Sequence, residues 1–230
     1  MKITENLSKI RNEISAAEKQ FQRQPDSVRL LAVSKTRTVD EIMTAYDAGQ
    51  REFGENYCQE AVEKVEVIQQ KDIVWHFIGP IQSNKTNLIA THFDWVHTID
   101  RIKIARRLNE SRPDNTTTLN VCVQINISGE ESKSGISLDS LDEFLNEMTQ
   151  FEKLNVRGLM ALPAPSNNFE EQRAAFSELS QKFTDLKHSY PEFDTLSIGT
   201  TQDMLAAIAE GATIVRIGTA IFGPRNVRKT

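Results

Sequence analysis

The sequence predicts an α/β fold, namely a single (β/α)8 TIM barrel with an extra helix at its N-terminus. Short runs rich in apolar and β-branched residues alternate eight times with segments of helical periodicity. No Pro-, Gly- or Ser-rich linker breaks the alternation, so residues 1–230 are expected to form one domain. Eight such units fit a chain of 230 residues, near the lower end of the size range of this fold. An open doubly wound sheet, which the same alternation allows, is the alternative.

The first expected element is an amphipathic helix. Leu7, Ile10, Ile14 and Ala17 recur at helical spacing and give it one apolar face. Eight strands are expected after it, in the sequence runs 28–34, 51–54, 73–79, 94–99, 119–127, 155–162, 194–199 and 213–218. Strands that are separated by helices run parallel and are joined by right-handed crossovers, so successive strands are expected to lie side by side.

Two of the helices between the strands have clear start signals. Thr38 and Glu41 have the spacing of a capping box, and Gly49 ends the helix that they begin. Asn168 and Glu171 can play the same part ahead of a long helix with a periodic apolar face.

Composition and charge narrow the classes of function. The chain has 39% hydrophobic residues, and its 27 Lys and Arg against 32 Asp and Glu give a net charge of −5 and a pI near 5.5. This mild acidity argues against bulk nucleic-acid binding. The N-terminus is polar and no apolar run approaches the roughly 20 residues that cross a membrane, so a cytoplasmic protein with no membrane partner is expected. Cys58 and Cys122 lie in unlike contexts, as free thiols of a reducing compartment would, and no HExxH or CxxC spacing indicates a metal site.

The functional site is expected at the C-terminal ends of the strands, where barrel enzymes often hold phosphate in the loops after strands 7 and 8. Both loops here place glycine beside hydroxyl side chains ahead of a short helix. Such a loop suits a phosphate dianion, because glycine lets the backbone approach and the first-turn N–H groups face the anion. The candidate phosphate-binding residues are Ser197, Gly199, Thr200, Thr201, Gly218 and Thr219. For either loop alone, the alternative is that its glycine only forms a turn and binds no phosphate.

Lys35 ends the first strand. Alternation puts Leu31, Val33 and Lys35 on one face, and barrel closure would place this strand beside the eighth and its phosphate loop. An amine over an apolar floor beside a phosphate site suggests a Schiff base with pyridoxal 5′-phosphate (PLP), because burial lowers the pKa of a lysine and frees its amine. A strand-end lysine that extends to solvent is the alternative.

Arg216 lies in the eighth strand, where alternation puts it on one face with Ile214. If it points inward, its guanidinium can face the pyridine nitrogen of PLP. An arginine is always cationic and only donates, so it would keep that nitrogen unprotonated and weaken the electron sink. An ion-paired arginine at a strand end is the alternative.

Three further residues are weaker candidates. Asn56 and His76 fall at strand ends and could contact the PLP ring or its O3′. Met160 could pack on a ring face, although a methionine in the core is the commoner role. Lys133, in a polar loop, is expected to be solvated.

Seven strings of the sequence together resemble the pyridoxal phosphate homeostasis protein family: AVSKT, FGENYCQE, WHFIGPIQSNK, INISGEESKSGI, GLMALPAP, LSIGTTQDM and VRIGTAIFG. The resemblance implies a monomeric barrel like the N-terminal domain of alanine racemase, with PLP held as an internal aldimine. It assigns Lys35 to the Schiff base, Arg216 to the pyridine side, and Gly218 with Thr219 to a phosphate-binding turn. The other loop reads Ser-Ile-Gly-Thr-Thr where family members commonly read Ser-Met-Gly-Met-Ser, so Ser197, Thr200 and Thr201 stay alternatives for the phosphate hydroxyl.

The expected function is a PLP carrier or buffer that serves vitamin B6 and amino-acid homeostasis with little catalysis, and PLP-dependent apoenzymes are its possible partners. A PLP-dependent amino-acid racemase is the alternative. Racemisation needs an acid or base on each face of the Cα, and eight strand–helix units leave no room for a second domain that would bring the opposing base. A phosphate-sugar barrel enzyme fits the fold but not the family strings.

Overall fold

A computed structural model of the chain describes residues 2–130 and 133–224. Its eight parallel strands pair in sequence order and close into a barrel, as the register of Arg29 opposite Ile214 between the last strand and the first shows. The (β/α)8 barrel is therefore confirmed, and the open doubly wound sheet is wrong.

Each expected strand run overlaps one strand of the structure. The strands are β1 Arg29–Val33, β2 Glu52–Glu55, β3 Val74–Phe77, β4 Trp95–Ile99, β5 Leu119–Ile125, β6 Leu154–Ala161, β7 Thr195–Ser197 and β8 Ile214–Ile217. Most are shorter than expected at their C-terminal ends. In β7 the ladder stops before Gly199, whose φ of +93° belongs to the left-handed region and turns the chain out of the sheet.

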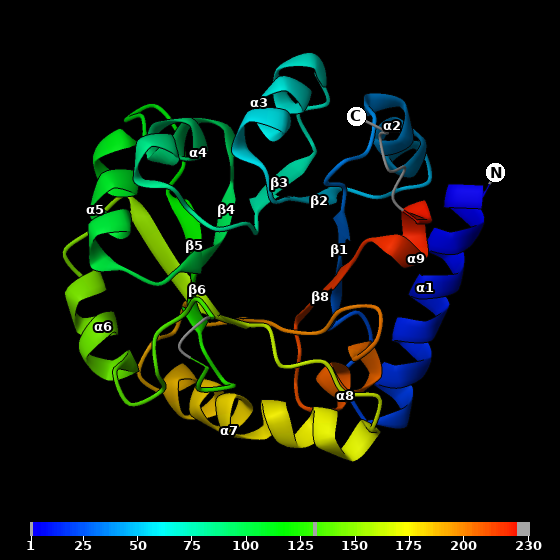
Figure 1. The fold of residues 1–230 in the computed structure, drawn as a ribbon. Helices are drawn as coiled ribbons and strands as arrows, with labels where there is room; N and C mark the ends of the chain where they lie inside the picture. The colour runs from blue at the N-terminus through cyan, green and yellow to red at the C-terminus, as the bar shows by residue number, and fades with distance from the viewer. Residues whose placement is uncertain (1, 131–132, 225–230) are drawn as a thin grey trace.

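The helices surround the barrel, and α1 lies along the side where β1 and β8 close it (Figure 1). They are α1 Lys2–Gln20, α2 Val39–Asp47, α3 Cys58–Val67, α4 Thr86–His92, α5 Ile102–Ser111, α6 Leu141–Met148, α7 Phe169–Lys187, α8 Met204–Ala209 and α9 Thr219–Phe222, with a 3-10 turn at Ser83–Lys85. The apolar face expected for α1 is buried against its neighbours α2, α8 and α9. No described helix is both long and apolar enough to span a bilayer.

Both predicted helix starts are present, with one difference. The Thr38 side chain accepts from the N–H of Glu41, whose carboxylate accepts from the N–H of Thr38, so the capping box of α2 is complete. Asn168 caps α7 by accepting from the N–H groups of residues 170 and 171. Glu171 does not complete a second box, because its carboxylate accepts from Ser166 Oγ instead.

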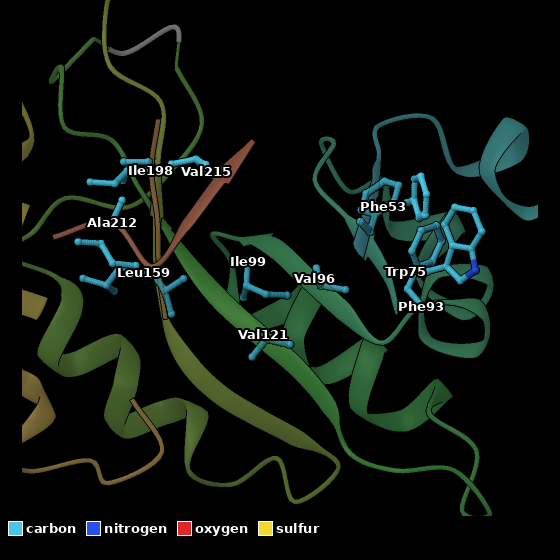
Figure 2. Close-up of a cluster of buried hydrophobic side chains, with 14 of the residues drawn as sticks. Phe53, Trp75, Phe93, Val96, Ile99, Val121, Leu159, Ile198, Ala212 and Val215 are labelled. Atoms are coloured by element: carbon cyan, nitrogen blue, oxygen red, sulfur yellow. The ribbon is translucent and has the colours of Figure 1, made fainter. Parts of the chain in front are cut away.

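The core has an apolar layer outside the barrel and a polar interior. Outward-facing strand residues such as Phe53, Val96 and Leu159 pack beneath the helices (Figure 2). Inside the barrel, Trp95 of β4 packs near Cys122 and Met160 in a small separate cluster. Buried polar side chains fill the remaining interior of the barrel and extend to the functional site.

Candidate functional site

A cavity of about 450 Å³ opens at the C-terminal ends of the strands. Its apolar wall is made by Val33, Ile78, Met160 and Leu162. Its polar lining consists of Lys35, Asn56, Thr200, Thr201, Gln202, Arg216, Gly218 and Thr219. The structure thus brings eight of the predicted site residues, Met160 among them, to one cavity. His76, Ser197 and Gly199 are not part of its lining.

Lys35 is presented on a tight turn just beyond β1. The N–H of Ser34 donates to Gly54 O at 2.9 Å, which continues the sheet by one bond, and the N–H of Arg37 donates back to Ser34 O at 3.0 Å. Between them, Thr36 has a φ of +63°, a left-handed conformation that is rare for a β-branched residue. Glu60 Oε1 accepts the Thr36 N–H at 2.6 Å and holds this turn in place. Such local strain next to a lining lysine is typical of functional sites.

A buried ionic cluster supports this turn from below. The Lys64 ammonium donates to Ser34 O at 2.9 Å, to Glu55 Oε1 at 2.8 Å and to Glu60 Oε1 at 2.6 Å. Ser34 Oγ also donates to Glu55 Oε1 at 2.6 Å. Glu55 is completely buried, and burial raises its pKa above the ordinary value although Lys64 opposes the rise. The cluster ties α3 to the turn that carries Lys35.

Arg216 points into the barrel top from β8 and is 5% exposed. Its Nη1 donates to the carbonyl oxygen and, at 2.8 Å, to the Oγ of Ser197, and its Nη2 donates to Ala161 O at 2.9 Å. Burial lowers the pKa of Arg216 to about 10, still well above neutrality, so it remains a cation. Within the described chain, its Nε–H and second Nη2–H have no protein acceptor and remain available on the cavity side.

Ser197 and Gly199, predicted as phosphate ligands, instead support Arg216. Ser197 is completely buried, and its hydroxyl contacts His97 Nδ1 at 2.8 Å as well as Arg216. Gly199 O accepts the Arg216 N–H at 2.9 Å. A Cβ at Gly199 would lie 2.5 Å from the Cβ of Ala207, so the tight turn requires glycine.

Of the other two hydroxyls in this loop, one is already engaged. Thr200 Oγ1 donates to Asp203 Oδ1 at 2.7 Å, and the Thr200 N–H donates to the same oxygen at 2.6 Å. Thr201 is exposed at the cavity. The geometry therefore separates the three alternatives: Ser197 lies behind the cavity, Thr200 is fixed by Asp203, and Thr201 faces the cavity.

The second glycine loop follows β8, the neighbour of β7, and lines the same cavity where α9 begins. Gly218 is the residue before its first turn, and a Cβ there would lie 3.3 Å from Val33 O. The first N–H groups of a helix have no partner within it, so those of Thr219 and Ala220 are open to an acceptor.

Asn56 stands between two cavities. Its side-chain Oδ1 is buried without a hydrogen-bond partner, and an unpaired polar atom of this kind in a cavity wall is a place for a ligand donor. Asn56 also lines an adjoining cavity of about 390 Å³. Lys133, expected to be solvated, lines that cavity with its side chain 31% exposed and pairs with Glu130 at 2.8 Å.

His76 lies deeper than predicted. It is completely buried within the barrel, with its ring stacked on Trp95 and its Nδ1 2.9 Å from His97 Nε2. The sequence placed it at a strand end, within reach of the PLP ring, but His76 lies inside the barrel and does not line the cavity. His97, Lys64 and Asp203 were not singled out by the sequence. The inward alternation of Trp95 and His97 is the one signal that could have found a member of this set.

The comparisons with known proteins agree on one family. The family model for the alanine racemase N-terminal domain matches residues 6–226. Pyridoxal phosphate homeostasis proteins of Escherichia coli K12 and Haemophilus influenzae are each 52% identical to this chain, and the matches cover 99% and 98% of it and 98% and 97% of those proteins.

Solved structures agree. PipY of Synechococcus elongatus, in a structure with PLP bound, is 33% identical with a TM-score of 0.83, and the match covers 96% of this chain and 100% of that one. Alanine racemase from Corynebacterium glutamicum has a TM-score of 0.67 at 15% identity, covering 99% of this chain and 62% of that chain, and this likeness concerns the fold alone.

Proposed function

This chain belongs to the pyridoxal phosphate homeostasis protein family, with the barrel of the alanine racemase N-terminal domain, and from this premise we propose that it binds PLP in the cavity above its strands. Its role is that of a carrier or buffer for the cofactor in the cytoplasm, with PLP-dependent apoenzymes as the recipients and with the single chain as the working unit. One observation carries the proposal: Lys35, Arg216 and two glycine–hydroxyl loops face a single cavity.

The residues present fit the chemistry of the cofactor. PLP supplies an aldehyde that condenses with an amine, and Lys35 Nζ provides that amine, so that a C=N bond forms and one water leaves. The phosphate suits the open N–H groups at the start of α9 with the hydroxyls of Thr201 and Thr219. The unpaired Oδ1 of Asn56 can accept from the ring hydroxyl.

Arg216 favours binding of PLP over catalysis with it. Its two N–H groups on the cavity side suit an unprotonated pyridine nitrogen, to which they donate. Its pKa of about 10 means that it does not give up a proton to that nitrogen at neutral pH. A ring nitrogen without a proton is a weak electron sink, which restricts carbanion chemistry at an attached amino acid.

The first experiment is covalent trapping. Purified protein is mixed with PLP and reduced with borohydride, and its peptides are mapped by mass spectrometry. The adduct is expected on Lys35 and is expected to disappear in Lys35→Ala. Lys85→Ala, which removes a lysine that donates to Gln59 Oε1, should keep it. An adduct that survives Lys35→Ala at the same peptide would refute the assignment.

A second experiment separates a carrier from a racemase. Loaded protein is incubated with each amino acid in deuterated water, and exchange of the α-hydrogen is followed by NMR. Negligible exchange is expected, because Arg216 weakens the electron sink. Rapid exchange that requires Lys35 would instead establish an enzyme of the racemase type.

A further inference from the structure

A line of buried polar groups passes through the barrel interior beneath the cavity. It starts at Arg216 Nη1, which is 2.8 Å from Ser197 Oγ, and continues to His97 Nδ1 at 2.8 Å. His97 Nε2 is 2.9 Å from His76 Nδ1. His76 Nε2 then faces Glu52 Oε2 at 3.5 Å, which is a contact between a ring and a carboxylate rather than a hydrogen bond, and neither atom has a hydrogen-bond partner among the described residues. Because the four strands β7, β4, β3 and β2 contribute one group each after Arg216, the contacts exist only in the closed barrel.

The two ends of this line meet different cavities. Arg216 lines the cavity at the C-terminal ends of the strands, whereas Glu52, at the first position of β2, lines a cavity of about 320 Å³ at their N-terminal ends. The three groups in the middle, Ser197, His97 and His76, are completely buried. Buried polar groups are retained at a cost, so a row of them through the interior of the barrel suggests a role beyond packing.

The charged groups at the two ends set the direction of the hydrogen bonds between them. Arg216 can only donate, so Ser197 Oγ accepts from it. A Glu52 carboxylate 3.5 Å from His76 Nε2 favours the proton of His76 on that nitrogen, and His76 Nδ1 then accepts from His97 Nε2–H. His97 Nδ1 is left as an acceptor, and Ser197 O–H donates to it.

Both histidines must be neutral for this arrangement. Burial lowers the pKa of His76 and of His97 well below the ordinary value, and the nearby cations Arg29 and Arg216 act in the same direction. The charged groups that face the line are Arg29, which lies 3.4 Å from Glu52 Oε1, and Arg216 itself, whose charge is opposed by Asp203. The ring of His76 is held from one side by Trp95, stacked at 5.5 Å.

We propose that Ser197, His97 and His76 form a hydrogen-bonded chain with one direction, set at one end by Arg216 and at the other by the carboxylate of Glu52, which lies 3.5 Å from His76. This chain holds Arg216 against the cavity and links the charge of Glu52, at the opposite mouth of the barrel, to the ligand that Arg216 contacts. These four are positioning residues. Loss of the charge at Glu52 removes the interaction that favours the proton on His76 Nε2, and the hydrogen bonds of the chain lose their single direction as a group. A set of unrelated structural contacts would respond only at the contact that was changed.

The chain itself can be tested without any cofactor. In protein labelled with ¹⁵N at histidine, NMR identifies the protonated ring nitrogen and detects coupling across an N–H···N hydrogen bond. His92→Gln and His188→Gln, on the outer helical layer, complete the assignment. The expected result is an Nε2–H tautomer at both His76 and His97, with coupling from His97 Nε2–H to His76 Nδ1. A doubly protonated ring, the opposite tautomer at either histidine, or no coupling between the rings would overturn the proposal.

The link to the cavity rests on the proposed function and is tested with PLP bound. The pH dependence of the cofactor absorption is compared between wild type and Glu52→Gln, which removes a charge with little change in shape. Asp26→Asn is the matched control, because it removes a carboxylate from the same cavity and its φ of +59° suits asparagine.

A shift of the absorption midpoint by a few tenths to about one pH unit is expected in Glu52→Gln and not in Asp26→Asn. An equal midpoint in wild type and Glu52→Gln, or an equal shift in both variants, would overturn the link. If PLP does not bind at all, the proposed function fails, while the NMR measurement still decides whether the chain exists.

Discussion

Replacement of Lys64 by methionine probes the ionic cluster beneath the Lys35 turn. Methionine keeps the shape of the side chain but removes a cation that is 6% exposed and donates three hydrogen bonds. Glu55, completely buried, would then retain only the Ser34 hydroxyl as a donor, and its Oε2 already has no partner. Removal of one member of a buried pair costs about 3–5 kcal/mol, which is a large part of an ordinary free energy of unfolding of about 5–15 kcal/mol.

The unfolding free energy that is lost in Lys64→Met should increase as the pH rises. A carboxyl group whose folded pKa is raised contributes its full stability below the unfolded pKa of 4.5, and that stability is lost as pH rises through the folded pKa. Burial already raises the pKa of Glu55, and removal of Lys64 raises it further. The variant therefore loses additional stability, up to about 1.4 kcal/mol per pH unit, over a wider range above 4.5 than wild type does.

Urea unfolding followed by tryptophan fluorescence measures both effects. The difference in unfolding free energy between wild type and Lys64→Met should be larger at about pH 8 than at about pH 5. Adding Glu55→Gln should recover most of the loss, because no buried charge remains without its partner. Lys9→Met, which breaks an exposed ion pair of 3.8 Å, should cost less than about 0.5 kcal/mol. A double variant as unstable as the sum of its single substitutions would refute the reasoning.

Three other predictions concern the scaffold. Thr38→Ala removes the side-chain half of the capping box and should lower the free energy of unfolding by about 1 kcal/mol in the same urea assay. Gly158→Ala should lower the free energy of unfolding by about 4 kcal/mol or more, measured by thermal unfolding, since the added Cβ would lie 1.7 Å from a backbone oxygen of β7. Gly129→Ala is the control: the glycine has open space around it, and the substitution should cost only about 1–2 kcal/mol. Equal costs in the two variants would contradict the clash. Cys58 is partly exposed and should react with a thiol reagent in the native protein. Cys122 should react only after unfolding, because this thiol is buried and its pKa is raised to about 12. Mass spectrometry locates the label, and labelling of both cysteines in the native protein would contradict this prediction.

The fold could be predicted because strand and helix periodicity alternate along the whole chain, and because the chain length fits eight strand–helix units. Eight apolar runs separated by capped helices leave few ways to bury both sheet faces, and the barrel follows. The same alternation put Lys35 and Arg216 on inner faces, and both line the cavity.

The depth of a residue within the barrel could not be predicted in this way. Alternation decides which side of a strand a residue faces, but not how far along the barrel axis it lies. His76, expected at a strand end, and Ser197, expected in a phosphate loop, are both completely buried and do not line the cavity. Lys64 was missed for a related reason: its partners come from β1, β2 and α3, and only the folded chain brings them together.

The position of the cavity at the seam between β1 and β8 also has a consequence for folding. Lys35 follows the first strand and Arg216 belongs to the last, so the cavity cannot form until the C-terminal strand has been made and the barrel has closed. Contacts this distant in sequence form late, because a long loop must first be ordered. The N-terminal helix then fastens the seam, since Arg23 donates to Ile208 O and Ala212 O, and Asn6 donates to Ile221 O. A ligand that binds this cavity thus distinguishes completed chains from nascent or truncated ones, and its binding reports the last step of folding.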